Sequence, residues 1–361
     1  MGQYALPVVW SPTTREHDPR HEVWVGTATP AAEVASRVDA ILEALQAAGH
    51  RLVEAPTAAE GTPQEMTSVH DPELLDFLRT AADRWLEGPY ADLAGQDRVV
   101  PYVFPTPAMT GSLPARRAVA VHADAGRFAY DTMTLVGPGT WAAARAAVDC
   151  ALGAVDLVVS GEPLAYALCR PPGHHATRAG YGGSCYLNNA AVAGQALRTR
   201  GVERVGVVDV DAHHGNGTAA IFYERGDVLY GSVHVDPGAG WFPHLVGFAD
   251  ETGAAAGAGA TRNLPMAEGT DDAAWLEAVH DLAGWVVAAG CTALVVSLGV
   301  DAAADDPESP LLVTRDGYRR GGALLAATGL PAVVVQEGGY HLPTLGGLVA
   351  AYLEGHGRGA S

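Results

Sequence analysis

One segment of the sequence, VDVDAHHGNGT, places two carboxylates and a histidine at a spacing that suits a metal site. The first residues of this segment are predicted to form a strand. Because side chains alternate along a strand, Asp209 and Asp211 point to the same side, and His213 continues that side just past the strand end. Burying two acids without a cation is costly, and the segment contains no lysine or arginine to pair with them. A bound metal ion is the simplest compensation.

A second strand-like run, SLGVD, ends in Asp301 and offers a third ligand. Asp211, His213 and Asp301 together give one nitrogen and two carboxylates, an acceptable zinc set that leaves room for a water molecule. Two anionic ligands cancel the charge of zinc, so the bound water is acidified less than at a three-histidine site. Such a site therefore needs a separate general base and a separate electrophile.

Candidates for both groups stand in two further motifs. In RPPGHHA, prolines and a glycine turn the chain at a strand end, and the His174 and His175 that follow can supply the base. In QEGGYH, two glycines after a strand let the backbone place the phenol of Tyr340 at the rim of a site. Tyr340 is therefore the candidate electrophile.

These motifs need a scaffold that brings their strand ends together. Apolar runs, several of them continuous, indicate strands covered on both faces, and the Ala- and Leu-rich segments between them indicate helices. The predicted strands are Val8–Trp10, Leu164–Cys169, Val205–Val210, Val228–Val233, Leu294–Leu298 and Ala332–Val335. The predicted helices are Ala31–Ala48, Thr140–Leu152, Asn188–Arg200, Trp275–Ala289 and Thr314–Ala327. This order predicts a single α/β domain over residues 1–361, with a central parallel sheet flanked by helices on both faces and its ligands beyond the carboxyl ends of the strands.

Residues 87–124 interrupt this alternation, because they are rich in proline and glycine and show little periodicity. A structureless loop of this length is uncommon inside a compact domain and is usually functional. We interpret it as a loop insertion near the active-site entrance or at a dimer contact.

Composition excludes several classes of protein. The chain of 361 residues is 48% hydrophobic and 17% charged, with a net charge of −19 and no basic block, which argues against nucleic-acid binding through phosphates. An acidic surface favours cationic substrates. The four cysteines are scattered and are expected to be free thiols. The sequence shows neither a secretory signal nor a run of ~20 apolar residues, so the expected location is the cytoplasm, without membrane insertion.

Taken together, RPPGHHA, CYLNNAAVA, VDVDAHHGNGT, SLGVD and EGGY resemble the histone deacetylase and acetylpolyamine amidohydrolase family, which shares its fold with arginases. The resemblance covers nearly the whole chain and includes VHDPELLDFL, PGTW and FYERGD. The insertion and the DPGAGWFPHLVGFADETG stretch are most similar to bacterial acetylpolyamine amidohydrolases. In those enzymes the insertion helps to form a dimer that constricts the site entrance, so the resemblance implies a homodimer.

The resemblance also implies a role for each catalytic side chain. His175 would be the general base and acid that acts on metal-activated water, with His174 as its electrostatic neighbour. Asp209 would orient His174, and Asn216 would orient His175. Tyr340 would hydrogen-bond the scissile carbonyl and then the oxyanion.

Two metal ions are implied in the same way. One zinc ion per chain would be bound by Asp211, His213 and Asp301, although the family pattern leaves iron open as the native metal. A potassium ion would lie nearby, held through Asp209, Asp211, His213 and Ser232.

The sequence departs from the family pattern in the substrate tunnel. Relatives line it with two aromatic rings, and Phe242 fits one of them. The second ring is expected just before Cys185, where this chain has Gly183 and Ser184. A serine there opens one wall of the tunnel.

A second departure concerns the charge that would recognise a polyamine. Polyamine-specific relatives carry an acid shortly before PGTW that contacts a distant ammonium group, and Met133 falls near that position here. Asp131 and Asp124 are the candidates to replace it.

The predicted function is therefore hydrolysis of the acetamide bond of a small acetylated amine. Acetyl-lysine in peptides or proteins, or a bulkier acetylated metabolite, is an alternative substrate. An inactive acyl-ligand binder is an alternative from another class. An arginase-type ureohydrolase is disfavoured, because Gly215 and Gly299 stand where a second metal would require acids.

Overall fold

A computed structural model describes residues 5–56, 63–89, 98–114 and 116–359 of the chain. Its centre is an eight-stranded sheet in the order β4-β1-β5-β10-β9-β6-β7-β8, in which every pairing is parallel. In chain order these strands are β1 Pro7–Trp10, β4 Arg51–Glu54, β5 Leu164–Ala167, β6 Val205–Asp209, β7 Val228–Val235, β8 Thr261–Met266, β9 Ala293–Leu298 and β10 Ala332–Gln336.

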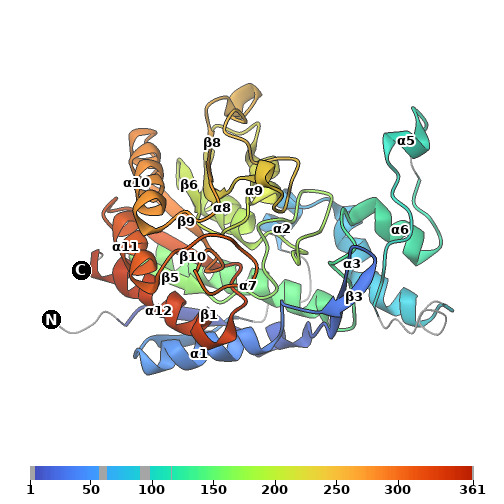
Figure 1. Cartoon of the computed structure of the whole chain (residues 1–361), viewed down its shortest axis with the longest axis horizontal. Helices are drawn as coiled ribbons and strands as arrows, with labels where there is room; N and C mark the ends of the chain where they lie inside the picture. Colours follow the sequence, from blue (N-terminus) through green and yellow to red (C-terminus); the bar gives the residue numbers. More distant parts are fainter. Residues whose placement is uncertain (1–4, 57–62, 90–97, 115, 360–361) are drawn as a thin grey trace.

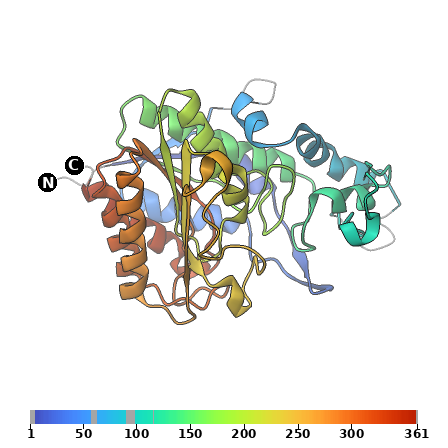
Figure 2. The same cartoon turned by 90° about the horizontal axis from the view of Figure 1, so that it is seen from above.

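Helices cover both faces of this sheet (Figures 1 and 2). Because successive side chains of a strand point to opposite faces, Val333 and Val335 of β10 join one apolar cluster, whereas Ala332 and Val334 join the other. The first face is covered by α2 Gln64–Val69, α3 Pro72–Leu86, α6 Val121–Phe128, α7 Thr140–Val159, α8 Asn189–Thr199 and α9 Asn216–Phe222. The second is covered by α1 Ser36–Ala47, α10 Asp272–Ala288, α11 Arg315–Ala326 and α12 Leu342–Gly359. The predicted fold class is confirmed.

All six predicted strands are present, and two strands of the sheet were not predicted. These are β4 and β8, the two edge strands, which carry charged and polar residues that hide the apolar signal. The predicted helix at Ala31–Ala48 begins later, at Ser36. Glu33, just before it, is buried and its carboxylate binds Arg37 and Arg170, so these residues serve a tertiary contact instead of a helical turn.

Residues 87–124 were predicted to be a loop, and the described part is not entirely irregular. It contains α5 Pro107–Thr110 and the start of α6, whose sequence VHADAGRF favours a helix. Residues 90–97 and 115 of the predicted insertion lie outside the described residues. The segment that carries α5 and α6 projects from the side of the molecule opposite the chain termini (Figures 1 and 2).

The sheet order places the candidate residues together. Strands β5, β10, β9, β6 and β7 are consecutive neighbours, and RPPGHHA, EGGY, SLGVD and DVDAHH lie at the carboxyl ends of the first four. A separate two-stranded hairpin, β2 His21–Trp24 and β3 Thr27–Pro30, pairs antiparallel outside the sheet. Among the described helices, none is both long and apolar enough to cross a membrane.

Candidate active site

Three predicted metal ligands converge at the ends of β6 and β9. Nδ1 of His213 lies 3.1 Å from Oδ2 of Asp301 and 3.3 Å from Oδ1 of Asp211. Ligand atoms of the three residues all lie within 4.8 Å of one another, and both aspartates are buried. One imidazole nitrogen and two carboxylates around a common point form a donor set that a divalent metal such as zinc accepts.

Backbone amides hold the two carboxylates in place. The N–H of Gly338 donates to Asp211 Oδ2 at 2.8 Å, and the N–H of Ala212 donates to Asp301 Oδ1 at 2.8 Å. Only glycine fits at position 338, because a Cβ there would lie 2.4 Å from Asp301 Oδ2. A Cβ at Gly299 would likewise lie 2.0 Å from Asp211 Oδ2, so this fold leaves no room for the acid that a two-metal ureohydrolase would need at that position.

The charge at this cluster also fits a bound metal ion. Among the described residues, no lysine or arginine forms an ion pair with Asp211 or Asp301. Burial, together with the neighbouring charge of Asp211, raises the pKa of Asp301 to about 7. A divalent cation would compensate the two buried carboxylates.

Two histidines lie beside this cluster, in the turn that follows β5. The rings of His174 and His175 have centroids 4.0 Å apart. Nδ1 of His174 lies 3.1 Å from Oδ2 of Asp209, and Nδ1 of His175 lies 2.7 Å from Oδ1 of Asn216. Because both partners offer oxygen acceptors, each Nδ1 carries the proton, and Nε2 of His175 is left with a lone pair.

The two histidines differ in their electrostatic surroundings. Burial lowers the pKa of His174, but Asp211 and Asp209 outweigh burial and raise that pKa to about 10. Burial and the neighbouring charges of His174 and His213 hold the pKa of His175 well below its usual range. A charged and a neutral imidazole therefore stand side by side.

A small cavity of about 80 Å³ opens onto these groups. It is lined by His175, His213 and Tyr340, and also by the four residues that the sequence analysis assigned to substrate binding, Met133, Gly183, Ser184 and Phe242. A larger cavity of about 1100 Å³ shares Met133, His213 and Phe242 with it and widens between the β2–β3 hairpin and residues 240–246. Described residues of the 87–124 insertion do not line either cavity.

The walls of the small cavity differ in character. The ring of Phe242 meets the ring of His175 edge-on, with centroids 4.7 Å apart. Gly183, at φ +57°, packs so closely that a Cβ would lie 2.5 Å from His175 Cδ2. Ser184 follows at φ +63° and donates its N–H to Thr134. Gly183 and Ser184 line this wall, and neither residue supplies a second ring.

Ser232, one of the predicted potassium ligands, lies on β7. It pairs with Asp209 across β6 and β7 and is buried, and its Oγ lies 2.8 Å from Nδ1 of His234. The hydroxyl of Tyr230 donates to Asp209 Oδ2 at 3.1 Å. Potassium binding at this point stays a prediction.

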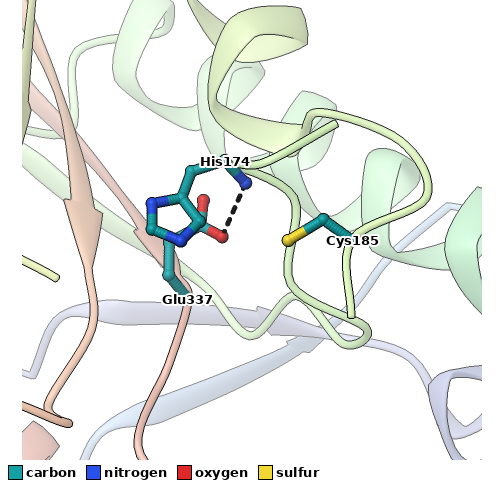
Figure 3. A group of neighbouring side chains, drawn as sticks. All are labelled: His174, Cys185 and Glu337. Atoms are coloured by element: carbon teal, nitrogen blue, oxygen red, sulfur yellow. Dashed lines mark hydrogen bonds between the residues drawn. The ribbon is translucent and has the colours of Figure 1, made fainter. Parts of the chain in front are cut away.

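A residue without a predicted role, Glu337, anchors the turn that carries the two histidines. Its Oε2 accepts hydrogen bonds from the backbone N–H groups of Gly173 and His174, at 2.7 and 3.1 Å. Figure 3 shows the side chains of His174, Cys185 and Glu337 pointing toward one another. Burial raises the pKa of the Cys185 thiol well above its usual range, so Cys185 stays protonated and is a poor metal ligand. The group therefore acts as a structural anchor.

Replacing Glu337 with alanine is expected to lower the free energy of unfolding by about 3 kcal/mol, because two buried backbone donors lose their acceptor. Glu337→Gln keeps an acceptor oxygen and should lose only about 1 kcal/mol. Urea unfolding of the two variants measures the difference. Equal stability of Glu337→Ala and the parent protein would contradict the anchoring role.

Comparisons with known proteins agree with this arrangement. Residues 31–356 match the histone deacetylase domain family. The chain is 41% identical to an acetylpolyamine amidohydrolase of Mycoplana ramosa, over 97% of this chain and 99% of that protein. It is 38% identical to acetylpolyamine amidohydrolase 1 of Pseudomonas aeruginosa, over 96% and 98% of the two chains. The crystal structure of an acetylpolyamine aminohydrolase from Burkholderia pseudomallei superposes with a TM-score of 0.90 at 40% identity, covering 98% of both chains. The chain therefore belongs to the histone deacetylase domain family of enzymes.

Proposed function

We propose that this protein is a zinc-dependent amidohydrolase that releases acetate and a free amine from small acetylated amines. The observation that carries the proposal is the single small cavity that His175, His213 and Tyr340 line together, beside the buried Asp211 and Asp301. The acetylpolyamine amidohydrolases that resemble the chain over nearly their whole length support this substrate class.

The residues divide the chemistry among them. A zinc ion held by Asp211, His213 and Asp301 would polarise the acetyl carbonyl and acidify a water molecule. His175 accepts the proton of that water at Nε2, because its Nδ1 is engaged by Asn216. Tyr340 donates a hydrogen bond to the carbonyl oxygen and to the oxyanion that develops there. His175 then donates the proton to the nitrogen of the leaving amine.

His174 and Asp209 support these reaction steps without contacting the amide bond that is hydrolysed. Asp209 holds the His174 ring through Nδ1, and Nε2 of His174 lies 3.8 Å from Asp211 Oδ1. We propose that a potassium ion binds beside Asp209 and Ser232. We also propose that the enzyme is a cytoplasmic homodimer, with the 87–124 insertion at the dimer contact.

Steady-state kinetics across a substrate panel tests the proposed function. The panel contains acetylputrescine, acetylcadaverine, acetylspermidine and an acetyl-lysine peptide, each assayed by acetate release from the zinc-loaded protein. The proposal predicts the highest kcat/KM for the small acetylated amines. A higher kcat/KM for the peptide would support the alternative, an acetyl-lysine deacetylase, in which Ser184 stands where relatives carry a second ring.

Asn216 provides a sharper test of the role of His175. Replacing Asn216 with alanine is expected to lower kcat about 10- to 100-fold, because His175 loses the partner that fixes its tautomer and orientation. Asn216→Asp keeps an oxygen acceptor at the same place and should retain most of the activity. If kcat is unchanged in Asn216→Ala, His175 does not depend on this hydrogen bond.

A further inference from the structure

A second cavity, of about 620 Å³, lies beside the active-site cavities and has no role in the chemistry proposed above. We call it the α9 cavity, because residues of helix α9 form one of its walls. Asn216 and Val246 line both this cavity and the larger active-site cavity. Small-molecule sites usually have volumes of roughly 300–1,000 Å³. The α9 cavity is therefore large enough for a ligand and adjoins the active site.

The wall that α9 contributes is largely apolar. Ala219, Ala220 and Ile221 line the cavity from the helix, and Val246 lines it from the segment that follows Phe242. Ala220 and Val246 are exposed, so a ligand can enter from solvent beside them. Covering apolar surface of this kind contributes about 25 cal/mol per Å² to binding. This wall fits the apolar body of a small molecule.

A buried polar side chain of the same cavity lacks hydrogen-bond partners. His214 lines the cavity and is 1% exposed, and neither of its ring nitrogens has a partner among the described residues. The Oδ1 atom of Asn263, a neighbour of this ring, has no partner either. Leaving a buried polar group unpaired costs about 1–3 kcal/mol, and most such groups in proteins are hydrogen-bonded. A ligand that carries a hydroxyl or amide group would supply the missing partner.

The charges around the α9 cavity favour an uncharged ligand. Glu224 and Glu251 line it and no described lysine or arginine does, so an anion would be repelled. A cation gains little in exchange for its lost hydration. Oε2 of Glu251 already accepts hydrogen bonds from the N–H of Gly247 and from Nδ2 of Asn263. Glu224 is exposed, so solvent and salt screen its attraction for a cation.

The α9 cavity is linked to both active-site histidines through the first turn of α9. Oδ1 of Asn216 lies 2.7 Å from Nδ1 of His175 and accepts its proton in a hydrogen bond. The N–H of Thr218 donates to the carbonyl oxygen of His174 at 3.0 Å. The helix has only seven residues, or about two turns, so a contact at Ala220 acts on the same short element. A ligand that shifts α9 therefore also shifts the turn that carries the two histidines.

We propose that the α9 cavity is a second ligand site, which binds a small uncharged molecule with an apolar body and one hydroxyl or amide group. The apolar body lies against Ala219 and Ala220, and the polar group hydrogen-bonds to His214, all of which line the cavity. Because this ligand leaves the small active-site cavity free, it changes kcat without competing with the substrate. Binding at this site does not depend on the proposed function.

Three matched compounds test the site and its ligand class. Cyclohexanol, cyclohexylammonium and cyclohexanecarboxylate share one ring and differ in charge, and saturation-transfer NMR gives the affinity of the protein for each. We expect cyclohexanol to bind at least ~10-fold more tightly than either charged compound, because burying a charge is costly. Tighter binding of a charged compound would overturn the inference.

Two variants locate the bound cyclohexanol. Ala220→Trp places an indole in the cavity and should abolish binding there, whereas Ala274→Trp, at an exposed position of α10, is the control that should retain it. His214→Phe keeps a ring but removes its polar atoms, and should weaken binding about fivefold, the effect of one hydrogen bond. Equal affinity of the parent protein, Ala220→Trp and His214→Phe for cyclohexanol would overturn the site.

Acetate release from acetylputrescine tests the link to the active site. Saturating cyclohexanol should change kcat about threefold or more in the parent protein and leave KM nearly unchanged, with no effect in Ala220→Trp. A rise in KM alone would indicate competition at the active site and would overturn the link. Since the binding measurement needs no turnover, a parent protein that binds cyclohexanol at this cavity but releases no acetate would support the site and contradict only the proposed function.

Discussion

Replacing Asp301 with alanine is expected to abolish metal binding and to reduce acetamide hydrolysis to the uncatalysed background. Asp301 supplies one of the two carboxylates that face His213, at 3.1 Å. Without it, only one carboxylate and one imidazole remain, which is too few ligands for a tight divalent site. Metal content measured by inductively coupled plasma mass spectrometry after dialysis should fall from about one ion per chain to near zero.

Asp305→Ala is the matched control for this variant. Asp305 lies four positions further along the same segment, and its side chain is exposed and pairs with His341. Its removal should leave both metal content and kcat unchanged. If Asp301→Ala retains a full equivalent of metal and full activity, the metal centre lies elsewhere and the assignment of all three ligands fails.

Replacing Tyr340 with phenylalanine is expected to lower kcat about 10²- to 10³-fold, the usual effect of removing one oxyanion donor. The backbone N–H of Tyr340 donates to Asp306 at 2.6 Å, and the Arg37 guanidinium lies over the ring at 4.9 Å. Both contacts persist in phenylalanine, so the ring keeps its position. The hydroxyl has no hydrogen-bond partner among the described residues, so its removal leaves no buried group unpaired.

The pattern of kinetic constants identifies the role of the hydroxyl. A donor that acts mainly on the oxyanion lowers kcat and leaves KM nearly unchanged. Metal content and the free energy of unfolding should both equal those of the parent protein. A Tyr340→Phe enzyme with unchanged kcat would exclude the hydroxyl as the electrophile.

The central strands and the metal ligands could be predicted because their signals are local. Strands such as β6 and β9 are buried on both faces and therefore read as continuous apolar runs. Asp209, Asp211 and His213 lie within five consecutive positions of one strand end, so their common direction follows from the alternation of side chains. Asp301 follows another strand end, and parallel strands place such ends at one edge of the sheet.

The missed features depend on contacts between distant parts of the chain. Glu337 reaches the backbone of Gly173 from a different strand end, and only the adjacency of β10 and β5 brings the two together. Helix α12 was missed for a local reason, because its five glycines weaken the helical pattern, and packing against α11 and α1 stabilises it.

Removal and return of the metal is the most direct test of the central claim, which is that acetamide hydrolysis depends on a metal ion at Asp211, His213 and Asp301. Acetate release from acetylputrescine is measured for the purified protein, after chelation and dialysis, and again after addition of one equivalent of zinc. The account predicts that activity disappears with the metal and returns with zinc in the parent protein, but does not return in Asp301→Ala. Undiminished acetate release by the metal-free protein would contradict the account. The absence of acetate release from a protein that binds zinc fully at these ligands would contradict it as well.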